Sequence, residues 1–274
     1  MNRSTLAGTA LCLAGFASAG HADPLWPLDD KFNVSLGVFF LDTETTMRLD
    51  GDAGRVGTEV NFGRELGLKS GDRFRIDGYW RFFDRHKLRF MYFDSKEGNT
   101  RTINRDIEFG DTTFPLNVEV RTDIKVEIFE LAYEYSFLKR DNLELSGTIG
   151  LHNLSVKAGL HADASSNAGL GGLDLEEAAD GDGPLPVVGL RGLWALNDHF
   201  YFDAQVQFFA VKFDNYDGNL QDYKLSFNWQ PFEHFGVGLG YNDFSTRLDV
   251  DEEHFNGKLR FNYDGPLLFV TGAF

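Results

Sequence analysis

The sequence predicts an all-β protein, a transmembrane antiparallel up-and-down β-barrel of about ten strands. Hydrophobic and polar residues alternate with a period of two along nearly every ordered segment, and the hydrophobic faces are rich in aromatic residues. Charged residues lie opposite those faces, and short connections alternate with longer ones. Aromatic residues make up 15% of the 274 residues and include 27 Phe. A soluble β-sandwich is the alternative, but its outer faces would not need so many aromatic residues.

Charge and cysteine content exclude other classes of protein. The chain has 26 Lys and Arg against 42 Asp and Glu, a formal net charge of -16. We therefore expect no nucleic-acid partner, because a polyanion requires clustered cations. The single cysteine, Cys12, permits no intrachain disulfide and no cysteine-based metal site. No nucleotide fingerprint or phosphate loop is present, so we expect no cofactor.

The first 22 residues predict a cleaved signal peptide. Arg3 supplies a short positive region, residues 6–16 form an apolar stretch, and residues 20–22 offer a small-x-small cleavage site. A helix that spans a bilayer needs about 20 apolar residues, so this stretch is too short to be an anchor. We expect a signal peptide over 1–22 and a single barrel domain over 23–274.

Period-two alternation identifies the strands. In residues 32–40, aromatic and aliphatic side chains occupy every second position, as in a strand with one apolar face. Two segments change phase: apolar residues are even over 118–126 and odd over 129–137, which predicts a β-bulge near Ile128. The last segment changes from odd positions to even ones, which predicts a bulge at Gly265 and Pro266 within one long strand.

The polar faces predict a charged lumen. A ten-stranded barrel is only slightly wider than the eight-stranded barrels whose side chains fill the interior. Unpaired charges in so narrow a space are costly, so we expect cross-strand ion pairs that close most of the bore. An open porin, with charges lining a water channel, is the alternative. The predicted network comprises Arg75, Asp77, Arg81, Lys87, Arg89, Glu127, Glu130, Glu134, Glu144, Arg191, Asp203, Lys224, Lys258 and Arg260.

The connections set the strand count. Four short turns are expected, at residues 84–86, 139–141, 197–199 and 230–234. The five intervening loops cover 50–71, 96–117, 163–183, 214–219 and 249–253. These nine connections give ten strands, or eight or twelve if a long loop has been misassigned. Short turns on one side and longer loops on the other are typical of outer-membrane barrels.

With the predicted signal peptide, the alternation and Phe274 at the end of the last strand, the chain resembles the small outer-membrane β-barrel proteins of Gram-negative bacteria. Leu268, Val270 and Phe274 resemble the signal that the outer-membrane assembly machinery recognises, although Gly272 stands where an aromatic residue is common. The resemblance implies the outer membrane as location, and that machinery, outer-membrane lipids and lipopolysaccharide as partners. It implies no activity, because barrels support many functions. The oligomeric state stays open.

Two classes of function remain. The first is a non-enzymatic envelope protein, either a structural or surface-interaction barrel or a narrow, porin-like diffusion pore. The second is a hydrolase at the outer rim that acts on lipid A or peptides. Residues 249–254 combine acidic residues with His254, as in the omptin proteases, but a solvated acidic loop explains this composition better. His152 lies near Ser155 in sequence, but no orienting carboxylate is evident. We expect no catalytic residue and no metal site.

The third long loop, residues 163–183, is acidic and contains no Lys or Arg. A hydrated surface loop is the expected structure. A second hypothesis is that the acidic residues bind divalent cations that bridge to lipopolysaccharide. The spaced ligands of an EF-hand are absent, so the sequence favours the hydrated loop.

Overall fold

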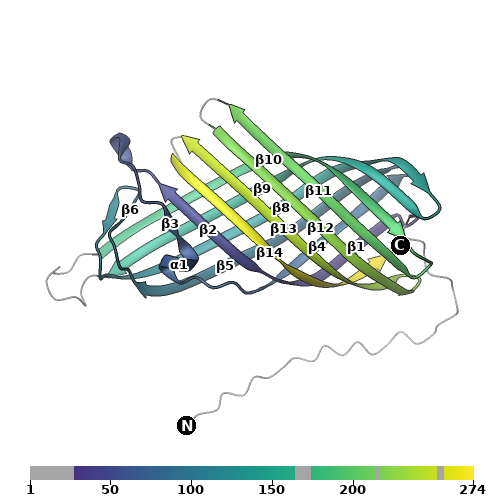
Figure 1. The fold of residues 1–274 in the computed structure, drawn as a ribbon, viewed down its shortest axis with the longest axis horizontal. Coiled ribbons are helices and arrows are strands. Elements are labelled where there is room, and N and C mark those ends of the chain that lie inside the picture. The colour runs from purple at the N-terminus through teal and green to yellow at the C-terminus, as the bar shows by residue number, and fades with distance from the viewer. Residues whose placement is uncertain (1–27, 164–173, 214–215, 252–255) are drawn as a thin grey trace, which may run out of the picture.

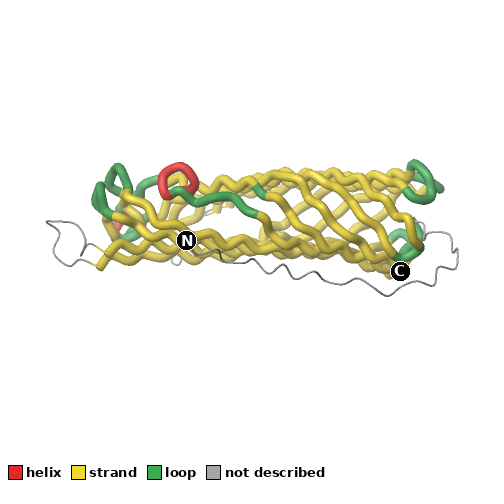
Figure 2. The backbone as a smooth tube through the Cα atoms, turned by 90° about the horizontal axis from the view of Figure 1, so that it is seen from below, coloured by secondary structure: helices red, strands yellow, loops and turns green. Residues whose placement is uncertain are grey.

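The computed structural model describes residues 28–163, 174–213, 216–251 and 256–274. The predicted signal peptide lies outside the described residues. The chain folds into a closed antiparallel barrel, seen from the side in Figure 1 and as a backbone tube in Figure 2. The strands of the ring, in order, are β1 (Phe32–Phe40), β4 (Asp72–Phe83), β5 (His86–Thr102), β8 (Glu119–Arg140), β9 (Leu143–Asp163), β10 (Asp174–Ala195), β11 (Phe200–Phe213), β12 (Tyr216–Phe232), β13 (Phe235–Asp251) and β14 (Asn256–Ala273).

Pairing of β1 with β14 closes the ring. Strand β2 (Asp42–Leu49) continues β1 beyond Leu41, and both pair with β14 in one unbroken register, from Asn33 opposite Ala273 to Leu49 opposite Gly257. The two segments are therefore one wall strand, and the predicted count of ten is confirmed. The short β3 (Val60–Asn61) adds to the edge of β2 above the ring.

An apolar band surrounds the half of the barrel that ends in the short turns. We call this the lower half, and the half toward the long loops the outer half. On β1, every second residue from Phe32 to Phe40 is an exposed hydrophobic side chain. This nine-residue strand rises about 30 Å along its own axis, and tilt reduces this to the height of a bilayer core. Trp80, Trp194 and Trp229 lie near the short turns, where an aromatic girdle is expected. Within the described residues, no helix has the length and hydropathy to cross a membrane.

The longest strands continue well past this band, and there the two faces of the wall exchange character. On β8, the even-numbered residues face inward from Val120 to Ser136. They are polar at Glu134 and Glu130, and apolar at Ile128 and Val126. The bulge predicted near Ile128 is therefore wrong, because the pairing of β8 with β5 and β9 runs through this position without a shift. The sequence changes phase because the surroundings of the barrel change from lipid to water.

The bulge predicted at Gly265 and Pro266 is wrong for the same reason. Odd-numbered residues of β14 face inward from Gly257 to Ala273, and the registers with both neighbours are constant. A local distortion is nevertheless present. Gly265 has φ 151°, and a Cβ at this position would lie 2.0 Å from the carbonyl oxygen of Phe40. Only glycine fits here, and the register of β14 is the same on both sides of this position.

The third long loop is shorter than predicted. Residues 174–183, expected in a loop, form the first half of β10 and pair with β9 from Asp163 opposite Asp174 onward. Lys157 pairs with Asp180 at 3.1 Å, and Asn153 donates to Asp182 at 2.8 Å across this hairpin. Cross-strand pairing thus overrides the turn-like Asp and Gly composition. Residues 164–173 lie outside the described residues.

Two loops cover the outer mouth of the barrel with hydrophobic side chains. The loop after β2 contains the 3-10 helix η1 (Asp52–Gly54) and the helix α1 (Phe62–Leu66). The Asn61 side chain caps the start of α1 by accepting a hydrogen bond from the Arg64 backbone amide. The loop after β5 folds into a hairpin of β6 (Ile107–Phe109) and β7 (Thr112–Phe114). Phe62, Leu66, Ile107, Phe109 and Phe114 are buried in one core with the inward residues of the outer half of the wall, and this core seals that half.

Candidate functional site: the barrel lumen

The lower half of the lumen is filled by a network of ion pairs, and its centre is Glu144 on β9. Arg81 on β4 donates two hydrogen bonds to this carboxylate, at 2.9 and 3.1 Å. Lys87 on β5 donates a third, at 2.8 Å, and Ser136 on β8 donates a fourth. The side chain of Glu144 is 1% exposed. Four hydrogen bonds from three residues on three different strands therefore converge on one buried anion.

Glu134 on β8 forms the next layer of the network. It accepts from Lys87 at 3.0 Å and from Arg89 at 3.0 Å. Tyr79 lies between these cations, with Lys87 Nζ 5.0 Å and the Arg89 guanidinium 4.7 Å from its ring centroid. The ring face stabilises both positive charges in a space that excludes water.

Two further groups complete the network. Lys224 on β12 donates to Asp77 on β4 at 2.9 Å, and Arg75 lies 3.5 Å from the same carboxylate. Arg191 on β10 pairs with Asp203 on β11. The pair of Lys224 and Asp77 joins β12 to β4, which are not neighbours in the ring, whereas Arg191 and Asp203 lie on adjacent strands.

Three members of the predicted network lie elsewhere. Glu127 faces outward on β8, where it pairs with Lys125 at 2.8 Å and accepts from Tyr92 at 3.2 Å. Lys258 and Arg260 face outward on β14, above the apolar band. The prediction that these three residues face the lumen is wrong for one reason. The predicted bulges would have exchanged the inward and outward faces along the outer half of β8 and β14, and the structure has no such exchange. The other predicted members lie on the inward face of their strands.

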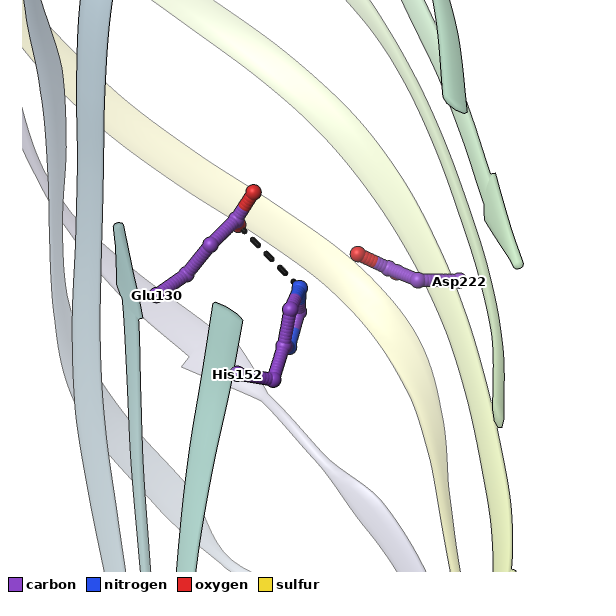
Figure 3. A group of neighbouring side chains, drawn as sticks. All are labelled: Glu130, His152 and Asp222. Carbon is purple, nitrogen blue, oxygen red and sulfur yellow. Dashed lines mark ion pairs between the residues drawn. The ribbon is translucent and has the colours of Figure 1, made fainter. Parts of the chain in front are cut away.

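Where the polar half of the lumen meets the apolar half, Glu130, His152 and Asp222 converge from β8, β9 and β12 (Figure 3). One ligand atom of each lies within 4.8 Å of those of the other two, and all three side chains are buried. His152 Nε2 lies 3.5 Å from Glu130 and 3.0 Å from the Gln207 side-chain oxygen. Above them, the His152 ring stacks on Phe244, with 6.2 Å between centroids.

An imidazole and two carboxylates are a donor set that suits a transition metal. However, each group already has partners in the protein. Gln207 donates to Glu130 at 2.6 Å, and Asn242 and Gln205 donate to the two oxygens of Asp222. Arg75, which donates to Asn242, supplies positive charge beside both carboxylates. The contacts therefore favour a hydrogen-bonded structural cluster, in which the negative charges are already compensated.

The ion-pair network leaves little free volume around Tyr79. The void between Tyr79, Lys87, Arg89 and Glu134 measures ≈ 10 Å³, at most the room that one water molecule requires, roughly 10–15 Å³. At the turn end, the chain before β1 folds into the mouth of the barrel. Leu28 is buried there against Leu193, Ala195 and Tyr201. The described residues thus close the bore at this end, in the middle and at the outer mouth.

Asp30 fixes this inner plug. It is buried, and its carboxylate accepts from the Tyr79 hydroxyl and, at 3.1 Å, from Asn33, while Arg81 donates to its backbone carbonyl at 3.1 Å. Burial raises the pKa of the Asp30 carboxyl from 3.8 to about 6, although both side-chain hydrogen bonds act in the opposite direction. The neutral carboxyl is therefore favoured in the folded protein at mildly acidic pH.

The raised pKa predicts a pH-dependent plug. The folded state binds the Asp30 proton more tightly than the unfolded chain, so its stabilisation is complete below pH 3.8 and is lost as the pH rises through about 6. The difference corresponds to about 3 kcal/mol. Protease cleavage near Leu28 should be faster at pH 7.5 than at pH 5, after correction for the protease's own pH profile. The Asp30→Asn variant should lose this dependence; if it keeps the full dependence, another group is responsible.

The predicted assembly residues lie at the end of β14. Leu268, Val270 and Phe274 point outward and are 55%, 43% and 61% exposed. The Phe274 ring stacks on His234, with centroids 5.1 Å apart, and its backbone bonds to Phe32, which closes the ring. Of the predicted combination of acidic residues and His254 at 249–254, residues 252–254 lie outside the described residues. Asp249 pairs with Lys258 at 2.7 Å on the outer surface.

Two site residues were missed by sequence reasoning. Asp222 has the same strand parity as Lys224, which was predicted to face the lumen, so alternation alone would have found it. Asp30 precedes the first strand, and no periodicity in the sequence indicates that it folds back into the lumen. Only the tertiary structure places it beside Tyr79.

A closed antiparallel ring with an outward apolar band and a polar lower lumen defines a transmembrane β-barrel of the outer-membrane type. No protein-family model and no curated protein matches the sequence. Among solved structures, the fold is similar to that of the outer membrane protease OmpT from Escherichia coli. That match has a TM-score of 0.58 and 13% identity, and covers 91% of this chain and 98% of OmpT.

Two other barrels align over much of the chain with lower scores. Ail, the attachment invasion locus protein of Yersinia pestis, matches with a TM-score of 0.31 and 9% identity, over 89% of this chain and 99% of Ail. The toluene transporter TodX of Pseudomonas putida matches with a TM-score of 0.34 and 8% identity, over 89% of this chain and 90% of TodX. The match to OmpT supports the fold, and at 13% identity it shows no activity.

Proposed function

We propose that the protein is a sealed, non-enzymatic barrel of the Gram-negative outer membrane, which acts as a structural and surface-interaction protein and conducts no solute. The observation that carries this proposal is the closure of the bore at three levels. Leu28 and Asp30 fill the inner mouth, the network around Glu144 fills the middle, and the apolar core around Phe62 fills the outer half. We include insertion by the outer-membrane assembly machinery through Leu268, Val270 and Phe274 in this proposal.

The three closures differ in chemistry, and this supports a permanent seal. Water or an ion that passed through would need to break charge-assisted hydrogen bonds below and separate packed aromatic rings above. Breaking buried ion pairs costs several kcal/mol each, and opening the packed core removes dispersion contacts as well. A diffusion pore requires an open, hydrated lumen, and these contacts oppose one. The surfaces left for function are the long outer strands and their loops.

Planar-bilayer recording tests the proposal. The purified protein should give no stable single-channel steps at either polarity, while an open porin reconstituted in the same way should. Insertion must be verified independently, by heat-modifiable migration of protein recovered from the same vesicles. Reproducible steps in proportion to inserted protein would contradict the sealed barrel and support the narrow pore.

The outer-rim hydrolase is the second candidate, since the fold is shared with a protease and His152 lies between two carboxylates. The burial of His152 argues against it, because a substrate cannot reach a side chain that is 0% exposed. Lipid A mass spectra from a deletion strain, and peptide-cleavage assays on whole cells, test this candidate directly. A lipid A species that changes on deletion and is restored by the wild-type gene would favour the hydrolase.

A further inference from the structure

Four cations lie side by side on the outer surface of the barrel, above the apolar band. They are Arg48 on β2, Arg247 on β13, and Lys258 and Arg260 on β14, and we call them the cationic patch. The register places Arg247 directly opposite Arg260, and Lys258 directly opposite Arg48. Three adjacent strands thus align four positive charges on the outer face of one part of the wall.

Half of these charges lack a counter-ion. Arg48 pairs with Asp50 at 2.8 Å, and Lys258 pairs with Asp249 at 2.7 Å. Neither Arg247 nor Arg260 forms an ion pair with any described residue, and both are exposed. Like charges directly opposite each other on neighbouring strands destabilise a sheet. Two adjacent unpaired arginines are unusual in a chain with a net charge of -16. An external anion bound between them would reduce their mutual repulsion.

The patch surrounds a hollow. A pocket of ≈ 90 Å³ is lined by the four cations together with Thr46, Glu59 and Leu259. This volume is several times what one water molecule needs, so a tetrahedral oxyanion fits. Arginine presents a planar fork of donors that matches phosphate oxygens in pairs. Glu59 is the one carboxylate in the lining. Because it repels an anion, the anion would lie on the side of the pocket formed by the arginines.

The height of the patch indicates what surrounds it. On β13, Tyr241 is the last large exposed hydrophobic residue, and Arg247 follows it along the same outward face. The intervening residues raise Arg247 roughly 15 Å above Tyr241, given the usual rise and tilt of barrel strands. In a Gram-negative outer leaflet, the phosphate-bearing sugars of lipopolysaccharide occupy the layer just beyond the hydrocarbon.

From this arrangement, we infer that the cationic patch is a binding site for lipopolysaccharide, which it holds by phosphate groups placed between Arg247 and Arg260. Arg48 and Lys258 flank the phosphate and keep their own carboxylate partners. The inference is independent of whether the lumen conducts, because every residue of the patch faces away from the lumen.

Binding of lipopolysaccharide to the detergent-solubilised protein tests the site. The double variant Arg247→Gln and Arg260→Gln should bind roughly tenfold or more weakly than the wild type, because two charge-assisted contacts are lost. The matched control is the double variant Arg121→Gln and Lys125→Gln, which removes two outward cations on β8 that pair with Asp123 and Glu127. The control should bind like the wild type, and unchanged heat-modifiable migration verifies that both variants are folded.

Three ligands separate the phosphate from other contributions: intact lipopolysaccharide, enzymatically dephosphorylated lipopolysaccharide, and phosphatidylglycerol micelles. Binding should be strong for the first, weak for the second and insensitive to the arginine substitutions for the third. Equal binding of intact and dephosphorylated lipopolysaccharide would overturn the phosphate assignment. Equal affinity of wild type and the arginine variant for intact lipopolysaccharide would overturn the site, and arginine-dependent binding of phosphatidylglycerol would overturn its selectivity.

Discussion

Replacing Glu144 by glutamine should lower the free energy of unfolding by roughly 3–5 kcal/mol, the cost of removing one partner from a buried ion pair. Glu144 accepts from Arg81, Lys87 and Ser136, and its side chain is 1% exposed. The amide keeps the shape of the carboxylate but leaves two cations without their full counter-charge. Urea unfolding in detergent, followed by the shift between folded and unfolded migration, measures the change.

A matched control and a rescue make this result specific. Glu176→Gln on β10 changes the same side chain at an exposed position and should cost less than about 0.5 kcal/mol. Adding Arg81→Met to Glu144→Gln should recover part of the loss, because Glu144 is the carboxylate with which Arg81 pairs, and the guanidinium left without it is removed. If Glu144→Gln differs from the wild type by no more than Glu176→Gln does, the network does not hold the barrel together.

Replacing Phe261 by alanine should cost roughly 3–5 kcal/mol, as expected for a large side chain deleted from a well-packed core. Phe261 is 1% exposed, and its ring lies 6.3 Å from that of Phe244 and 5.8 Å from that of Tyr263. The cavity would open inside the barrel above the membrane, so lipid cannot fill it. The same unfolding assay measures the loss.

Asn262→Ala is the control for Phe261→Ala, because the next residue on β14 lies on the opposite face of the wall. It accepts a hydrogen bond from Ser245 at 2.8 Å and should cost about 1 kcal/mol or less. The pair of variants tests which face is inside. A greater loss for Asn262→Ala than for Phe261→Ala would mean that the odd positions of β14 face outward, as the predicted bulge required.

Much of the barrel could be predicted from local patterns. Alternation from Phe32 to Phe40, or from Phe129 to Phe137, identifies a strand and its lipid-facing side, since only one period fits a pleated strand in a bilayer. The short turns then fix the number of strands. The charges on the lower polar face, such as Arg81 and Glu144, could be assigned to the lumen by parity. Which cation meets which carboxylate could not, because partners come from strands far apart in the sequence.

The outer half of the wall could not be predicted in the same way. Val126 and Ile128 resemble lipid-facing residues, and Glu127 resembles a lumen residue, yet the structure reverses both. The same reversal applies to Phe261 and Arg260 on β14. An alternating pattern shows that a strand has one apolar face and one polar face. It does not state which face is inside, because that depends on whether lipid or water lies beyond the wall.

The strands, their number, the apolar band and the lower charged face could be predicted from local patterns, because each depends on side chains that repeat every second residue. The folded barrel was needed to show that the outer half of the lumen is an apolar core under two loops, and that Leu28 and Asp30 close the inner mouth. The fold also places Arg247 beside Arg260 on the outer surface. These features depend on the closure of the ring, which brings distant segments into contact and sets where the membrane ends.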